Sequence, residues 1–279
     1  HREIMTTTKR SARRVVRLVA SCAVVVRALR SAGVHQGVPA PQTSCTGRRR
    51  ALGLLVGGTL SRAAIIPPPA RALENAVPEA AQYADRPKRP GPKPTDLGLK
   101  DRDNVDSDEP ELRLCGGAPN CFSTTPDDVA PEHVIARWVA PKGLSRADAY
   151  AQIRDAVRRY APGQSGIDGG GFRIVTDDAD RGFLYAQFES LKNGYVDDLE
   201  LAFPAADDAS RLELRVRSSS RVGYLDFGVN AKRLNAISAT LREAHDWTAP
   251  AITAQTHPIY FQLNAPKPDQ VAPSTAFYR

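Results

Sequence analysis

The segment 217–233 carries the densest group of polar side chains in this chain that could do chemistry. It mixes arginines, serines and glycines with aromatic residues, and it brings Lys232 and Arg233 into the first turn of a predicted helix. Positive charges at the start of a helix interact unfavourably with the helix dipole, and a paired carboxylate or a bound anion offsets this effect. Two interpretations stay open: an internal network of arginines and aspartates that fixes the fold, or a pocket for an anionic or polar group. The candidate residues are Asp197, Asp198, Arg217, Ser219, Arg221, Asp226, Asn230 and Arg233.

Specific roles are predicted within this set. Asn230 is expected to cap the helix, because its side-chain oxygen can accept a hydrogen bond from a free backbone N–H of the first turn. Asp226 and Asp197 are the carboxylates expected to hold Arg221 and Arg233 through charge-assisted hydrogen bonds. Asp197 shares a predicted strand face with apolar residues, so it points toward the core and needs a partner there.

Cys115 and Cys121 form a second chemical feature, separated by Gly-Gly-Ala-Pro-Asn. Two glycines and a proline allow a turn sharp enough to bring the two sulfur atoms together. In an export compartment a disulfide is favoured over two free thiols, which remain the alternative. A structural zinc site needs four ligands, and the sequence offers no second pair at ligand spacing. No metal, no other cofactor and no catalytic residue are therefore predicted.

The elements that position these residues follow from the periodicity of apolar residues. Ser145 is the predicted cap of a helix that ends at Pro162, and a second helix is predicted from Asn230 to about His245. Alternation with period two predicts strands over 171–176, 183–190, 195–203 and 211–217, and 133–139 adds one strand before the first helix. The order β-α-β-β-β-β-α with short connections predicts the α+β class: an antiparallel sheet of about four to five strands packed by two helices.

The strand over 211–217 alternates apolar and charged residues most regularly. Its apolar side chains are predicted to face the core. Its charged side chains are predicted on the outward face, with Arg217 at the edge of the sheet where the long connection begins.

The N-terminal quarter is predicted to be a targeting segment rather than a folded domain. Through Ala72 the chain has 13 Lys and Arg against one acidic residue, and the rest has a net formal charge of −5. Residues 1–47 are rich in Arg and Ser, as plastid transit peptides are. Residues 48–72 begin with three consecutive arginines, followed by a modestly apolar run and an Ala-Arg-Ala site, which favours a twin-arginine signal. Two such signals in series predict the chloroplast thylakoid lumen.

The mature chain is predicted in three parts. Residues 73–110 are rich in proline and lack apolar periodicity, so they are predicted to form a linker. Residues 111–248 form the predicted globular domain. Residues 249–279 form a second proline-rich tail, in which one apolar stretch over 259–263 can dock on the domain.

Three stretches, 114–121, 196–200 and 216–233, resemble the family called domain of unknown function 1499. The resemblance covers about half of the chain, from Glu111 to Trp247. Its most specific part is Arg-Ser-Ser-Ser-Arg-Val-Gly-Tyr-Leu-Asp-Phe-Gly-Val-Asn and the arginine three residues later. Gly116 and Gly117 stand where the family pattern has a proline. The family includes plastid members that resemble lumenal proteins and has no established activity, so the resemblance implies a location and a motif but no reaction.

Two functions are expected from these observations. The first is a non-enzymatic accessory or binding protein of the thylakoid lumen that supports photosystem assembly or maintenance, with thylakoid membrane protein complexes as partners. The alternative is an enzyme or a carrier of an anionic molecule, lipid or pigment, with Arg217 and Arg221 as the ligand contacts. Nucleic-acid binding is disfavoured because the mature chain is acidic. No stretch reaches the roughly 18 apolar residues of a membrane-spanning helix, so the mature chain is predicted to have none.

Overall fold

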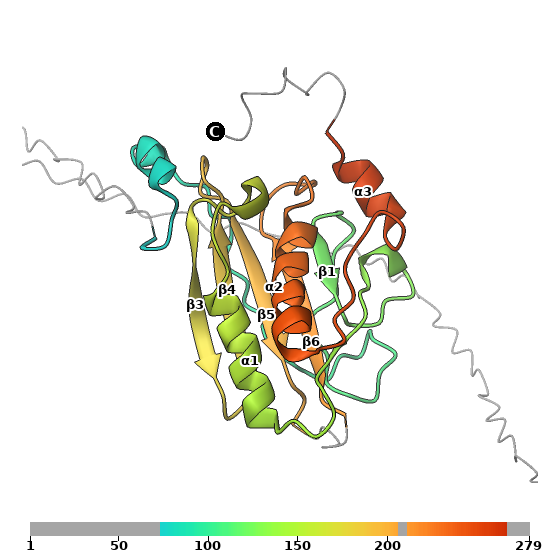
Figure 1. Ribbon diagram of the computed structural model, residues 1–279. Coiled ribbons are helices and arrows are strands. Elements are labelled where there is room, and N and C mark those ends of the chain that lie inside the picture. The colour runs from blue at the N-terminus through green and yellow to red at the C-terminus, as the bar shows by residue number, and fades with distance from the viewer. Residues whose placement is uncertain (1–72, 206–210, 267–279) are drawn as a thin grey trace, which may run out of the picture. The chain divides into compact units, whose positions relative to one another are not determined.

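A computed structural model describes residues 73–205 and 211–266 of this chain (Figure 1). The predicted targeting segments 1–47 and 48–72 lie outside the described residues, as does the end of the tail after residue 266. The strands are β1 Cys121–Ser123, β2 Trp138–Val139, β3 Gly171–Asp178, β4 Phe183–Glu189, β5 Val196–Ala202 and β6 Glu213–Ser220. The α-helices are α1 Arg146–Arg158, α2 Val229–His245 and α3 Pro258–Asn264, and short 3₁₀ turns are η1 Pro78–Tyr83, η2 Pro131–His133 and η3 Gln164–Gly166.

The strands form one antiparallel sheet in the order β1-β6-β5-β4-β3, and β2 also pairs with β6. Figure 1 shows α1 and α2 lying side by side across one face of this sheet. The α+β class and the antiparallel sheet are therefore confirmed. The sheet has six strands rather than four or five, because β1 is only three residues long and too short to show an alternating pattern.

The core lies between the sheet and the two helices. Helix α1 begins after Ser145, whose Oγ accepts a hydrogen bond of 3.1 Å from the backbone N–H of Asp148, as its spacing predicted. Its apolar stripe packs on the sheet beside that of α2. Burial of each large apolar side chain stabilises the fold by roughly 1.5–3 kcal/mol. The fully buried members include Phe122, Ile153, Leu184, Leu199, Leu214, Leu234 and Leu241.

Residues 73–110, which we call the strap, are attached to the sheet instead of forming a free linker. The side chain of Asn75 accepts a hydrogen bond of 2.9 Å from the backbone N–H of Phe172 in β3. Lys88 forms an ion pair of 2.6 Å with Glu189 in β4, and the backbone N–H of Gly98 donates to Glu200 in β5 at 2.7 Å. The sequence predicted a free linker because this segment has no apolar periodicity. Its contacts with the sheet are polar, and polar contacts of this kind produce no such periodicity.

The strap changes the character of the outward face of β6. Arg215 and Arg217 do lie on the outward face of β6, as predicted, but they are only 1% and 2% exposed, so this part of the face is not open to solvent. Arg215 forms an ion pair with Glu109. Glu111 forms an ion pair with Arg137, with a nitrogen–oxygen distance of 2.5 Å. The outward face is thus a second buried layer made of polar and charged side chains.

The residues after α2 also pack on the domain. Helix α3 places the ring of Tyr260 4.4 Å from that of Phe122, so the predicted docking of the stretch 259–263 is observed. No helix in the ranges 73–205 and 211–266 has the length and apolar character needed to cross a membrane.

Candidate functional site

Arg233 is the centre of a buried polar network at one end of the sheet. All five N–H groups of its guanidinium donate hydrogen bonds, and the group stacks 4.6 Å from the ring centre of Phe188. Two of the bonds go to Asp168 at 2.5 and 2.8 Å, and one goes to Asp197 at 2.7 Å. The acceptors of the other two are Ser218 and Asn230. Desolvation opposes the charge on Arg233, but the two aspartates outweigh it and raise the pKa of this arginine.

Asp226, rather than Asn230, caps helix α2. Its carboxylate accepts hydrogen bonds of 2.9 Å from the backbone N–H groups of Gly228 and Asn230, and it also accepts from the hydroxyl of Tyr260 at 2.8 Å. The side-chain amide of Asn230 instead donates a hydrogen bond of 2.9 Å to the backbone carbonyl of Asn120. The predicted cap was wrong because Asn230 already lies inside the helix, which begins one residue earlier.

Arg221 pairs with Asp198, whereas Asp226 and Asp197 were its predicted partners. The two groups form a bidentate pair with hydrogen bonds of 2.7 and 2.8 Å, and Tyr185 donates 2.6 Å to the same carboxylate. Asp198 and Asp197 are neighbours on β5, and successive side chains of a strand point to opposite faces. Arg221 therefore belongs to the outward layer, whereas Arg233 belongs to the layer beneath the helices.

Arg217 and Ser219 also lie in the outward layer. Arg217 approaches Glu200 to 3.6 Å, yet its guanidinium donates no hydrogen bond to any residue of the described ranges. Burial lowers the pKa of Arg217 to about 10, and burial raises the pKa of Glu200. Ser219 pairs in register with Cys121 of β1 and donates a long hydrogen bond to the carbonyl of Ser220.

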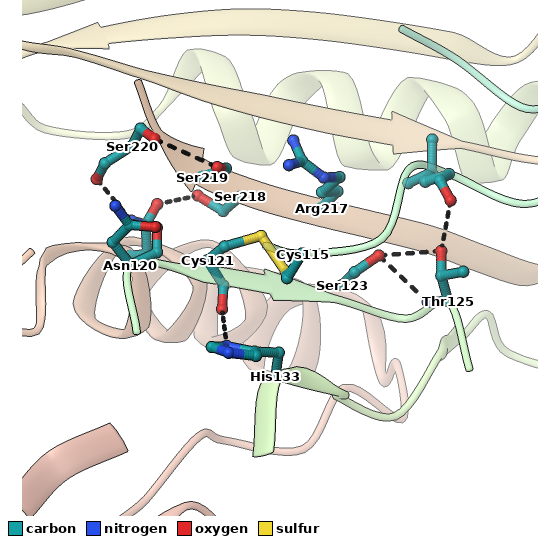
Figure 2. The surroundings of a disulfide bond; sticks show 12 residues. Cys115, Asn120, Cys121, Ser123, Thr125, His133, Arg217, Ser218, Ser219 and Ser220 are labelled. Atoms are coloured by element: carbon teal, nitrogen blue, oxygen red, sulfur yellow. Dashed lines mark hydrogen bonds between the residues drawn. A yellow bond between two sulfur atoms is a disulfide. The ribbon is translucent and has the colours of Figure 1, made fainter. Parts of the chain in front are cut away.

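Cys115 and Cys121 form the predicted disulfide, with their Cα atoms 5.7 Å apart. Figure 2 shows this bond beside β6, close to Ser218 and Ser219. The loop that the bond closes ends at Asn120, whose side-chain amide donates a 2.6 Å hydrogen bond to the carbonyl of Gly223. The backbone N–H of Ser220 donates to the carbonyl of Asn120 at 3.0 Å. The disulfide loop therefore holds the connection between β6 and α2 in place.

A cleft of about 830 Å³ opens above the Arg233 network, and we call it the strand-end cleft. The α1–β3, β4–β5 and β6–α2 connections form its walls, and they come together at the upper end of the sheet in Figure 1. Asp168, Asp197, Ser220 and Asp226 contribute to its polar surface. Its apolar surface includes Val77, Pro162, Ile167, Leu191, Val222, Leu225 and Phe227.

Phe227 is the most unusual residue of this cleft. Its side chain is 60% exposed, and its backbone has a φ of +56°, where a bulky residue is strained. The conformation is held by the side chain of Asn264 in α3, which accepts hydrogen bonds from the N–H groups of Asp226 and Phe227 at 3.0 and 2.8 Å. The fold therefore places an exposed aromatic ring at the cleft although the backbone conformation of this residue is unfavourable.

The structure divides the predicted residues between two layers. Asp197, Asp226, Asn230 and Arg233 meet beneath the strand-end cleft, while Asp198, Arg217, Ser219 and Arg221 lie on the opposite face of the sheet. Asp168 was missed, because it lies in a loop without periodicity. The signal that could have found it is the need of a buried arginine for more than one carboxylate.

The buried carboxylates give a prediction for the effect of pH on stability. Burial raises the pKa of Glu111, Asp168, Glu200 and Asp226 above the ordinary range near 4. The folded state then takes up protons at a higher pH than the unfolded chain, so its stability rises as the pH falls through the folded pKa values. We expect the melting temperature to be higher at pH 5.5 than at pH 7.5 in a calorimetric scan.

The Glu200→Gln variant is the control for this effect. Its carboxylate no longer titrates, so the dependence of melting temperature on pH should become weaker. Protonation of Asp96 would lower the stability instead of raising it. Arg102 and Lys100 lower the pKa of Asp96 to about 2, so this effect appears only in stronger acid. A melting temperature that falls steadily from pH 7.5 to pH 5.5 would contradict the prediction.

Residues 111–241 match the model of a family described as Protein of unknown function (DUF1499). The match begins where the strap ends and stops within α2, so it includes the disulfide loop, the sheet and the polar segment. No curated protein and no solved structure is significantly similar to this chain.

Proposed function

We propose that this chain, whose residues 111–241 are a domain of the DUF1499 family, is a non-enzymatic accessory protein of the thylakoid lumen that acts by binding in the strand-end cleft. The cleft itself carries the proposal. Its volume of about 830 Å³ lies in the range typical of small-molecule sites, and it combines apolar walls with a few convergent polar groups.

The bonding of Asp226 and Arg233 supports a structural role over a catalytic role for these two residues. A general acid or base must have a titratable group within hydrogen-bonding distance of its substrate. The carboxylate of Asp226 is occupied by the helix N–H groups, by Asn230 and by Tyr260, and every N–H of Arg233 is engaged. These groups stabilise the shape of the cleft, which is what a binding site requires.

The lumenal location rests on the sequence of the first 72 residues and is supported by the disulfide. Disulfides persist in export compartments and are rare in reducing ones. Thylakoid membrane protein complexes are the proposed partners, in support of photosystem assembly or maintenance. Recovery of the processed chain in the lumenal fraction of isolated thylakoids tests this location.

An anionic ligand, the earlier alternative, has less support from the geometry. Arg217 and Arg221 are turned to the opposite face of the sheet, where Glu200 and Asp198 are their counter-charges. The binding role therefore belongs to the cleft and not to the arginines of the segment 217–233.

The binding proposal predicts that the protein takes up the neutral apolar dye Nile red in the cleft. Phe227→Asn should weaken this binding by about five- to tenfold, because it removes the exposed aromatic surface. Asparagine tolerates a positive φ, so the variant should fold as well as the parent. Fluorescence titration measures the affinity.

Val129→Asn is the matched control, because Val129 is a 94% exposed apolar residue that does not line the cleft. It should leave the affinity for Nile red unchanged. Equal losses in the two variants, or no saturable binding at all, would reject the cleft as the binding site.

A further inference from the structure

We infer that the strand-end cleft takes an amphipathic ligand with a cationic, hydrogen-bond-donating head group, of which a primary alkylammonium is the simplest example, and that Asp197 contacts the head. This inference rests on the proposed binding role of the cleft and adds the chemical class of the ligand. Three independent features carry it: an open acceptor, the balance of charge, and the apolar walls.

The open acceptor is Oδ1 of Asp197. The residue is 8% exposed and lines the cleft. Its Oδ2 accepts a 2.7 Å hydrogen bond from Arg233, but its Oδ1 accepts none from the residues that the structure describes. Because the Asp197 side chain keeps 12% of its surface exposed, this oxygen is open to the cleft and can accept a hydrogen bond from a ligand.

The balance of charge favours a cation over an anion. Asp168, Asp197 and Asp226 line the cleft, and the single guanidinium of Arg233 lies behind them, fully buried. Asp226 is compensated by the backbone N–H groups at the N-terminus of α2, and the two remaining carboxylates against one guanidinium leave the inner surface negative. The rim does not reverse this balance, because Lys192 and Glu79 contribute opposite charges there.

The apolar walls require that the remainder of the ligand be apolar. Val222, Leu225 and Phe227 form one wall, and Ile167 and Leu191 come from two other connections. Phe227 and Val222 are partly exposed, so a bound alkyl or aromatic body would remove them from water. A fully hydrophilic cation would leave these surfaces uncovered.

Displacement of Nile red by three ligands with the same chain tests the inference. Octylammonium, octanol and nonanoate carry the same eight-carbon alkyl chain and differ only in the head group, and each is used at pH 7 below the concentration at which it forms micelles or separates from water. We expect octylammonium to displace the dye from the disulfide-bonded protein at a concentration at least about tenfold lower than nonanoate, because its head can donate to Asp197. Octanol should lie between them.

Two variants assign the preference to Asp197. Asp197→Asn should reduce the difference between octylammonium and nonanoate to less than about threefold, whereas Glu243→Gln, a change at an exposed carboxylate on α2 outside the cleft, should keep it. Phe227→Asn should weaken all three ligands together and keep their order. The order in the parent protein remains decisive if Asp197→Asn proves too unstable to purify.

The outcomes separate this inference from the proposed function. Nonanoate binding as well as or better than octylammonium overturns the cationic ligand, and so does a head-group preference that Asp197→Asn leaves intact. In both cases the cleft still binds, so the proposed function survives. If no ligand displaces the dye and the dye does not bind, both proposals fail.

Discussion

Arg233→Met is expected to lower the free energy of unfolding by roughly 3–5 kcal/mol, enough to unfold a domain of ordinary stability. The methionine fills much of the same volume, so packing is largely kept. The loss comes from Asp168 and Asp197, which are left buried without their counter-charge. Urea unfolding followed by tryptophan fluorescence measures the change.

Two comparisons identify the stranded charges as the cause. Arg158→Met removes an exposed partner of Asp177 and should cost less than about 1 kcal/mol. The triple variant Asp168→Asn, Asp197→Asn and Arg233→Met removes all three charges and should recover most of the lost stability. If the triple variant is as unstable as Arg233→Met alone, the charges are not the reason for the loss.

Removal of the strap is expected to have the second large effect. A chain that begins at Glu111 should be less stable than one that begins at Leu73 by on the order of 3 kcal/mol or more. The shorter chain loses the hydrogen bond from Gly98 to Glu200, the ion pair of Lys88 with Glu189 and the contact of Asn75 with β3. It also exposes the outward layer, so the midpoint of urea unfolding should fall.

A smaller change at one strap contact tests the mechanism of this effect. Asn75→Ala leaves the backbone N–H of Phe172 without its acceptor and should cost about 1 kcal/mol. Lys93, which makes no side-chain hydrogen bond or ion pair among the described residues, is the control, and Lys93→Ala should be neutral. Equal stability of the chains beginning at Leu73 and Glu111 would show that the strap is a linker after all.

The polar segment shows how far residue types alone can predict a site. Its three arginines each lie beside a carboxylate, but most of the partners differ from those predicted. Arg221 pairs with Asp198 and Arg233 pairs with Asp168 and Asp197, whereas Asp226 binds the N-terminus of α2. Partner choice depends on which face of β5 each carboxylate occupies and on where the α1–β3 loop returns, and neither is a local property.

The sequence by itself determined the parts of the fold that depend on local periodicity: the cap and stripe of α1, the alternation in β4 to β6, the α+β class, and the disulfide across a short Gly-Gly-Ala-Pro-Asn loop. Only the tertiary structure decided that the strap covers the sheet, that Arg217 is buried, and that Asp168 and Asp197 share one guanidinium beneath a cleft. The physical reason is that apolar burial repeats with the period of a helix or strand. Hydrogen bonds and ion pairs between distant segments have no period, so they become visible only when the chain is folded.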